Sequence, residues 1–116
     1  MTEQAPTWNE ERPIYRQLME EIVEGIINQT YPEGEMLPSV RRLASDFLVN
    51  PLTAARAYRE LEQFTETKRG IGVIVKDGVR EILMKRERKK FLREEWPAIR
   101  GRIDALEIDS DELFRS

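Results

Sequence analysis

The sequence contains no cysteine and no histidine. The lack of cysteine excludes disulfides, thiol nucleophiles and thiolate metal sites, and the lack of histidine excludes imidazole ligands and imidazole acid–base catalysis. An enzyme built from this chain would depend on a pair of carboxylates in a pocket, and no such pair stands out. We therefore expect neither an enzyme nor a metal site nor a cofactor.

Long apolar runs are also missing. No stretch approaches the roughly 18 apolar residues that a membrane-spanning helix needs. The first residues, MTEQAPTWNEERP, lack the basic and then apolar regions of a signal peptide. A chain of 116 residues is long enough for one compact domain with an appended element. We expect a soluble, cytoplasmic protein with no membrane partner.

Charge is distributed unevenly along the chain, whose net charge is −3. Residues 1–35 carry a net charge of −6, residues 36–76 carry +3, and residues 77–116 are neutral. Affinity for phosphate depends on the local face of a protein rather than on its total charge. The basic excess in the middle of the chain therefore favours nucleic-acid binding, and an ordinary solvated surface is the alternative.

The first helix is predicted from Pro13 to about Gln29, because apolar residues recur there every four positions at Ile14, Leu18, Ile22 and Ile26. Its exposed face should carry Arg16, Gln17, Glu20, Glu21 and Glu24. A second helix should begin after Ser39 as N-cap, and a third at Asn50-Pro51. The short connection between the second and third helices is typical of a helix-turn-helix motif.

A hairpin is predicted after the third helix, since Phe64–Thr67 and Val73–Val75 have strand composition. Four residues are expected at its basic, glycine-rich tip, namely Lys68, Arg69, Gly70 and Gly72. The order of helices and hairpin predicts a mainly α fold with a small β-hairpin, a winged helix-turn-helix domain.

The C-terminal part shows one long helical pattern from about Arg80 to Leu106, which Pro97 should kink or interrupt. Its apolar residues are spaced four, three, four and three apart, a heptad seam formed by Leu92, Trp96, Ile99, Ile103 and Leu106. Either this seam packs on its own domain or, as we favour, it pairs with a second copy, with Phe91 and Trp96 as anchors. We divide the chain into a flexible arm (1–12), a winged helix-turn-helix domain (13–77) and a helical dimerisation region (78–116).

Three motifs occur together in order: PEGEMLPSVRRL, VNPLTAARAYRELE and the RGIG of the hairpin. With them, the chain from Pro13 onward resembles the GntR family of bacterial transcription regulators, and its short helical C-terminal part is similar to the YtrA-type subgroup. The passage Glu62–Thr65 into the hairpin is shorter than is usual for that family. Either the wing is set at a different angle, or residues are absent from the chain.

The resemblance implies a repressor that binds an inverted-repeat DNA operator as a homodimer, with a small-molecule effector left open. The recognition helix, about 50–63, would enter the major groove, and the wing, about 64–75, would touch the minor groove or backbone. The DNA-binding residues carried over are Ser39, Arg41, Asn50, Leu52, Thr53, Arg56, Lys68, Arg69, Gly70 and Gly72. The alternative is a winged-helix module that binds protein without specific DNA binding.

Overall fold

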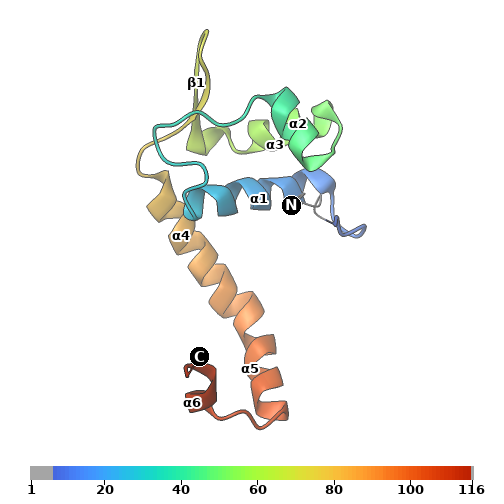
Figure 1. Ribbon diagram of the computed structural model, residues 1–116, viewed down its shortest axis with the longest axis vertical. Coiled ribbons are helices and arrows are strands. Elements are labelled where there is room, and N and C mark those ends of the chain that lie inside the picture. Colours follow the sequence, from blue (N-terminus) through green and yellow to red (C-terminus); the bar gives the residue numbers. More distant parts are fainter. Residues whose placement is uncertain (1–6, 116) are drawn as a thin grey trace. The chain divides into compact units, whose positions relative to one another are not determined.

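The computed structural model describes residues 7–115, which form two units that divide between Glu81 and Ile82. The first unit contains three helices and a two-stranded antiparallel sheet (Figure 1). The helices and strands of this unit are α1 (Ile14–Ile27), α2 (Val40–Phe47), α3 (Pro51–Glu60), β1 (Thr65–Lys68) and β2 (Gly72–Val75). The predicted mainly α fold with a small β-hairpin is confirmed.

The core of the first unit forms where α1 and α2 pack with α3. The α1 stripe contributes Leu18, Ile22 and Ile26, all buried. Each such side chain stabilises the fold by about 1.5–3 kcal/mol relative to exposure. In α3, the buried Ala54 and Ala57 have side chains small enough for close helix packing. Three of the four residues of the predicted apolar stripe therefore face the core, and the fourth, Ile14 in the first turn of α1, is exposed.

The two predicted helix starts are confirmed by their caps. Ser39 Oγ accepts a hydrogen bond from the Arg42 amide at 3.1 Å, and Asn50 Oδ1 accepts one from the Leu52 amide at 2.8 Å. Such caps satisfy backbone donors that have no partner within the helix. Leu48 ends α2 in the left-handed conformation, with φ of 53°, and so reverses the chain towards α3.

The predicted end of the third helix at about Gln63 is wrong, because α3 ends at Glu60. A 3₁₀ turn, Glu62–Phe64, follows and bridges the short passage into the hairpin. The Phe64 side chain is buried, and its backbone carbonyl accepts a hydrogen bond from the Lys76 amide at 3.1 Å. The short passage into the hairpin is therefore a 3₁₀ turn with a buried Phe64 ring rather than a further turn of α3.

The hairpin pairs Thr65 with Val75 at one end and Lys68 with Gly72 at the other. Lys68 and Gly72 form the last pair of the ladder, and only residues 69–71 lie between them, so the four residues predicted at the tip of the hairpin are found there. The segment before α2 forms a single antiparallel β-bridge, between Met36 and Ile74. This bridge attaches the segment before α2 to the free edge of the second strand.

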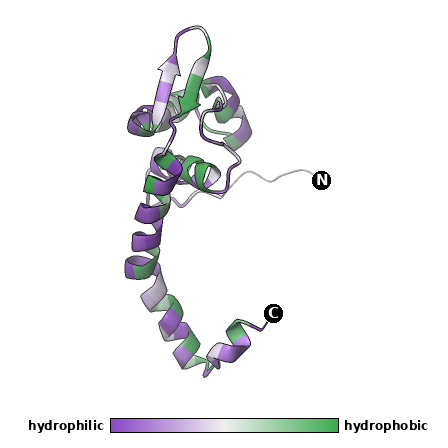
Figure 2. Ribbon diagram, turned by 90° about the vertical axis from the view of Figure 1, so that its left-hand side faces the viewer, coloured by the Kyte–Doolittle hydropathy of each residue, from purple (hydrophilic) through white to green (hydrophobic). Residues whose placement is uncertain are grey.

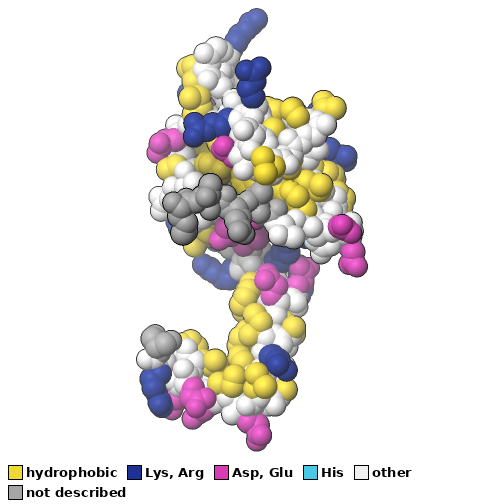
Figure 3. All heavy atoms as spheres, turned by 45° about the vertical axis from the view of Figure 1, so that its right-hand side comes forward, with side chains coloured by type: hydrophobic (Ala, Val, Ile, Leu, Met, Phe, Trp, Pro, Cys, Tyr) yellow, Lys and Arg dark blue, Asp and Glu magenta, His cyan; other side chains and the backbone are white. Residues whose placement is uncertain are grey.

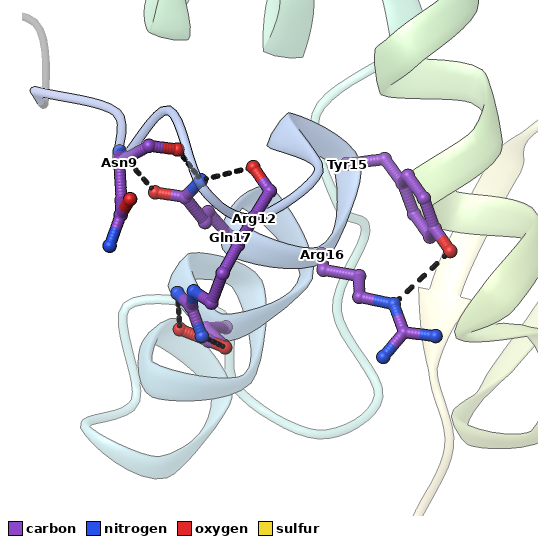
Figure 4. A network of polar contacts seen from close by, with 6 residues as sticks. Asn9, Arg12, Tyr15, Arg16 and Gln17 are labelled. Carbon is purple, nitrogen blue, oxygen red and sulfur yellow. Dashed lines mark hydrogen bonds and ion pairs between the residues drawn. The ribbon is translucent and has the colours of Figure 1, made fainter.

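Gln17 was predicted on the exposed face of the first helix, but its side chain is buried (Figure 4). Its Oε1 accepts from the Asn9 amide at 2.8 Å, and its Nε2 donates to the carbonyl oxygens of Asn9 and Arg12 at 2.7 and 2.9 Å. The Trp8 ring also lies 6.3 Å from the Phe47 ring. Of the arm expected at 1–12, residues 1–6 lie outside the described residues, and the following segment is anchored to this unit.

The long C-terminal helical pattern is divided into α4 (Val79–Lys90), a π-helical turn (Phe91–Glu95) and α5 (Trp96–Ala105), followed by α6 (Ser110–Leu113). Pro97 lies in the first turn of α5, directly after the π-helical turn. Proline has no amide hydrogen to donate to the preceding turn, so the predicted interruption is confirmed. Across residues 7–115, no helix has the length and apolar composition needed to cross a membrane.

Candidate nucleic-acid interface

The N-terminal end of α2 carries Ser39 and Arg41, both exposed. The Ser39 hydroxyl oxygen already caps the helix. The first-turn amides of a helix carry partial positive charge and favour anions. Arg41 adds a full positive charge in the same turn. These features suit a phosphate group, so both residues remain predicted phosphate contacts.

The residues predicted to read DNA lie in the first turns of α3, and their exposure to solvent differs from one to the next. Leu52 is 79% exposed, Arg56 is exposed, and Thr53 is only half-buried. Leu52 and Arg56 are four residues apart and therefore share one face of the helix. The Asn50 side-chain oxygen is engaged by its cap. Its amide nitrogen is the group of Asn50 that could donate to DNA.

The Arg56 side chain lies against the ring of Tyr15, a residue in the first turn of α1. Its guanidinium carbon is 3.8 Å from the centre of the Tyr15 ring, a close cation–π contact. The Tyr15 hydroxyl in turn accepts a hydrogen bond from Arg16 Nε at 3.2 Å (Figure 4). An ion pair of 4.0 Å to Glu60 is a weaker restraint on Arg56. The sequence carries no signal for the stack, because it depends on how two distant helices cross.

An open groove of about 410 Å³ runs along this contact and is lined by Ile14, Tyr15, Leu52, Thr53 and Arg56. The groove joins the N-terminal end of α1 to the exposed face of α3. Three of its residues were predicted to contact DNA. The structure therefore brings Leu52, Thr53 and Arg56 together and adds Tyr15 to them.

The wing carries Lys68 and Arg69, both exposed, and Figure 3 shows basic side chains gathered at the outer end of the hairpin. Gly70 has a φ of +80°, a backbone conformation that residues with a side chain rarely adopt. There is open space around it, because no atom lies within 4 Å of the place that a Cβ would occupy. At Gly72 a Cβ would lie 3.0 Å from Met36 Sδ. Gly70 is therefore required by the turn, and Gly72 by both its conformation and its packing.

A larger open cleft of about 610 Å³ lies between the segment before α2 and the helix itself, lined by Thr30, Tyr31, Met36, Leu37, Pro38, Ser39, Arg42 and Asp46. Its one carboxylate, that of Asp46, pairs with Arg42 Nε at 3.7 Å. The cleft therefore lacks the pair of carboxylates that acid–base catalysis would need in this chain.

Comparison with known proteins identifies the chain through its first unit. Residues 14–75 match the family described as bacterial regulatory proteins, gntR family. The HTH-type transcriptional repressor YtrA of Bacillus subtilis (strain 168) is 36% identical over 74 residues, which cover 62% of this chain and 57% of that protein. The chain thus spans little more than half the length of this curated relative.

Solved structures resemble the chain over a larger part of its length. A GntR family transcriptional regulator from Listeria monocytogenes has a TM-score of 0.71 and 30% identity, covering 93% of this chain and 95% of that one. The structure of AraR(DBD) in complex with operator ORX1 has a TM-score of 0.53 and 25% identity, covering 64% of this chain and 92% of that one. The predicted resemblance is confirmed, and the chain belongs to the GntR family of bacterial regulatory proteins, a family of transcriptional regulators rather than enzymes.

Proposed function

We propose that this chain represses transcription by binding an inverted-repeat operator as a homodimer. The single observation that carries the proposal is the exposed face of α3, where Leu52 and Arg56 project beside a capped helix start. The similar YtrA protein of Bacillus subtilis is a transcriptional repressor. The similar AraR(DBD) structure is a complex with operator ORX1. Both relatives support a role in binding an operator.

The dimensions of α3 suit the major groove of DNA. Its ten residues make a rod about 15 Å long, and the major groove, about 12 Å wide, admits one helix. Leu52, as an apolar side chain, would contact a thymine methyl group, and the Asn50 amide would reach a base or phosphate. These base-edge contacts would specify the sequence of the operator.

The basic residues outside α3 would position the protein rather than read bases. Arg41 at the start of α2 and Lys68 and Arg69 on the wing are exposed cations. Contacts to phosphate fix the register of a protein on the duplex and carry no direct sequence information. In this proposal the wing lies on the minor groove or the sugar–phosphate backbone beside the half-site.

The second unit would hold two copies together. Its seam remains exposed at Leu92, Ile99 and Leu106, which are 56%, 41% and 52% exposed. A sustained apolar seam on a helix is stabilised by a partner helix. Trp96→Ala should therefore produce monomers in sedimentation analysis, whereas a persistent dimer would assign the seam to packing within one chain.

A mobility-shift titration tests DNA binding directly, with fragments from upstream of the chain's own operon at several salt concentrations. Arg41→Ala, Lys68→Ala and Arg69→Ala should each weaken binding to all sequences and reduce the salt slope by roughly one. The matched control is Arg12→Ala, because Arg12 is paired with Glu20 at 2.8 Å and lies away from α3 and the wing in sequence. Absence of any shift at low salt would favour the protein-interaction module instead.

A further inference from the structure

The tip of the wing carries an exposed apolar residue, Ile71. Residues 69–71 join β1 to β2, and the Ile71 side chain among them is 62% exposed. The next apolar residues along β2, Val73 and Ile74, are half-buried. The hairpin extends beyond α1, α2 and α3 in Figure 1, and Figure 2 shows hydrophobic residues along β2 and hydrophilic ones along β1. Ile71 is therefore an apolar side chain held out at the end of the hairpin.

A single exposed isoleucine is common on protein surfaces, but the surroundings of Ile71 favour a nucleic-acid partner. Residues 67–72 include Lys68 and Arg69, both exposed, and no acidic residue. The residues on either side of Ile71 are glycines and add no side-chain width to the tip. The strands of a hairpin lie about 4.8 Å apart, and the minor groove of DNA is about 6 Å wide. A positively charged tip that bears one apolar side chain therefore suits this groove.

The backbone donor of Ile71 is already used within the hairpin. Its amide donates a hydrogen bond of 3.0 Å to the Lys68 carbonyl oxygen, and Lys68 forms the last ladder pair with Gly72. The group that Ile71 presents to a partner is therefore its apolar side chain. Such a side chain makes no hydrogen bond to a base, so it distinguishes base pairs only by their shape and by the polar groups that it covers.

We propose that Ile71 enters the minor groove beside the site of α3 and makes the protein select A·T or T·A pairs there. This inference rests on the DNA-binding function proposed above and adds a residue that specifies sequence. A·T and T·A pairs present the same acceptors in the minor groove, whereas a G·C pair adds the 2-amino donor of guanine. Under the Ile71 side chain this donor loses its water and gains no acceptor, which is unfavourable. G·C pairs are therefore rejected in either orientation.

Operators with inosine test this selection on the wild-type protein. Binding-site selection should yield, outside the bases that α3 reads, a position where A and T are equally frequent and G and C are depleted. Fluorescence anisotropy then compares operators in which this pair is A·T, G·C or inosine·C. Inosine resembles guanine in the major groove and lacks the 2-amino group. We expect G·C to weaken binding by roughly 5- to 30-fold relative to A·T, and inosine·C to bind almost as tightly as A·T.

Three variants of the wing assign the selection to Ile71. Ile71→Ala should lose most of the difference between A·T and G·C, because a smaller side chain leaves room for water at the amino group, whereas Ile71→Val should keep the difference. Arg69→Ala is the matched control and should weaken binding to all three operators equally, as expected of a phosphate contact. Both positions are exposed, so each variant should fold, and thermal unfolding verifies this.

Two results would overturn the role of Ile71 and leave the proposed regulator intact. One is an unchanged preference for A·T in Ile71→Ala, and the other is inosine·C that binds as weakly as G·C. A selected operator with no position of equal A and T would have the same meaning. Selection of no sequence at all would instead refute specific DNA binding, so the two failures are distinguishable. The inosine operators use wild-type protein and give their answer even if a variant does not fold.

Discussion

The stack between Tyr15 and Arg56 predicts that a residue of α1 controls DNA affinity through a residue of α3. The ring centre and the guanidinium carbon are 3.8 Å apart. An exposed cation–π contact contributes about 0.5–1 kcal/mol, and immobilising a long side chain at an interface costs about 0.5–1.5 kcal/mol. Because Tyr15 already orders Arg56, Tyr15→Leu should weaken DNA binding by roughly 2- to 10-fold.

Fluorescence anisotropy with labelled operator DNA measures this change, and two further variants assign it to Arg56. Tyr15→Phe retains the ring and removes only the hydroxyl that accepts from Arg16 Nε, so its affinity should stay close to that of the wild type. In an Arg56→Ala background, Tyr15→Leu should have no further effect. Thermal unfolding of each variant verifies that the fold is unchanged.

Two results would refute this reasoning. An equal loss of affinity in the presence and absence of Arg56 would show that Tyr15 acts through the fold rather than through the stack. Tighter binding by Tyr15→Leu would show that the stack withdraws Arg56 from DNA.

Three further substitutions test the recognition face and the core. Leu52→Asn should change base preference at one position of each half-site, since it replaces an apolar contact with hydrogen-bonding groups; an unchanged profile from selected binding sites would exclude this role. Tyr58→Phe removes a hydrogen bond of 2.5 Å to a backbone carbonyl and should cost about 1–2 kcal/mol of unfolding free energy. Burial raises the pKa of Tyr58, so this residue stabilises the fold below its unfolded pKa of about 10 and that contribution is lost as pH rises further; denaturation curves should show a smaller alkaline loss for Tyr58→Phe. Gly25→Ala would place a Cβ 2.5 Å from two atoms of the Tyr31 ring, and the resulting strain of about 1–3 kcal/mol should exceed the helix-propensity gain of about 1 kcal/mol and lower the Tm. Gly101→Ala is its control, because no atom lies within 4 Å of the corresponding Cβ, and this substitution should raise the Tm.

Local chemistry made much of the first unit predictable. Ser39 and Asn50 cap helices through their own side chains. Each is a residue type that favours the N-cap position and stands directly before a segment with a helical pattern, so both helix starts can be predicted from the sequence. The interruption near Pro97 likewise follows from the missing amide hydrogen of one residue. These features depend on short segments, so a sequence read without a structure can identify them.

Features that depend on distant segments were missed or misplaced. Gln17 is polar and was assigned to the exposed face, but it satisfies backbone groups of the segment that precedes α1. The stack of Arg56 on Tyr15 requires the crossing of α1 and α3. Gly25 lies inside α1, and the Tyr31 ring leaves no room for a side chain there. In each case the deciding partner comes from another element of the fold.

Selection of bound DNA from a random-sequence library tests the central claim most directly. A homodimer that places one copy of α3 in each major groove predicts an enriched inverted repeat, with half-sites centred about 10 base pairs apart or at a multiple of one helical turn. Enrichment of no sequence at low salt, or of a single half-site without its inverted copy, would contradict the proposed homodimeric DNA-binding regulator.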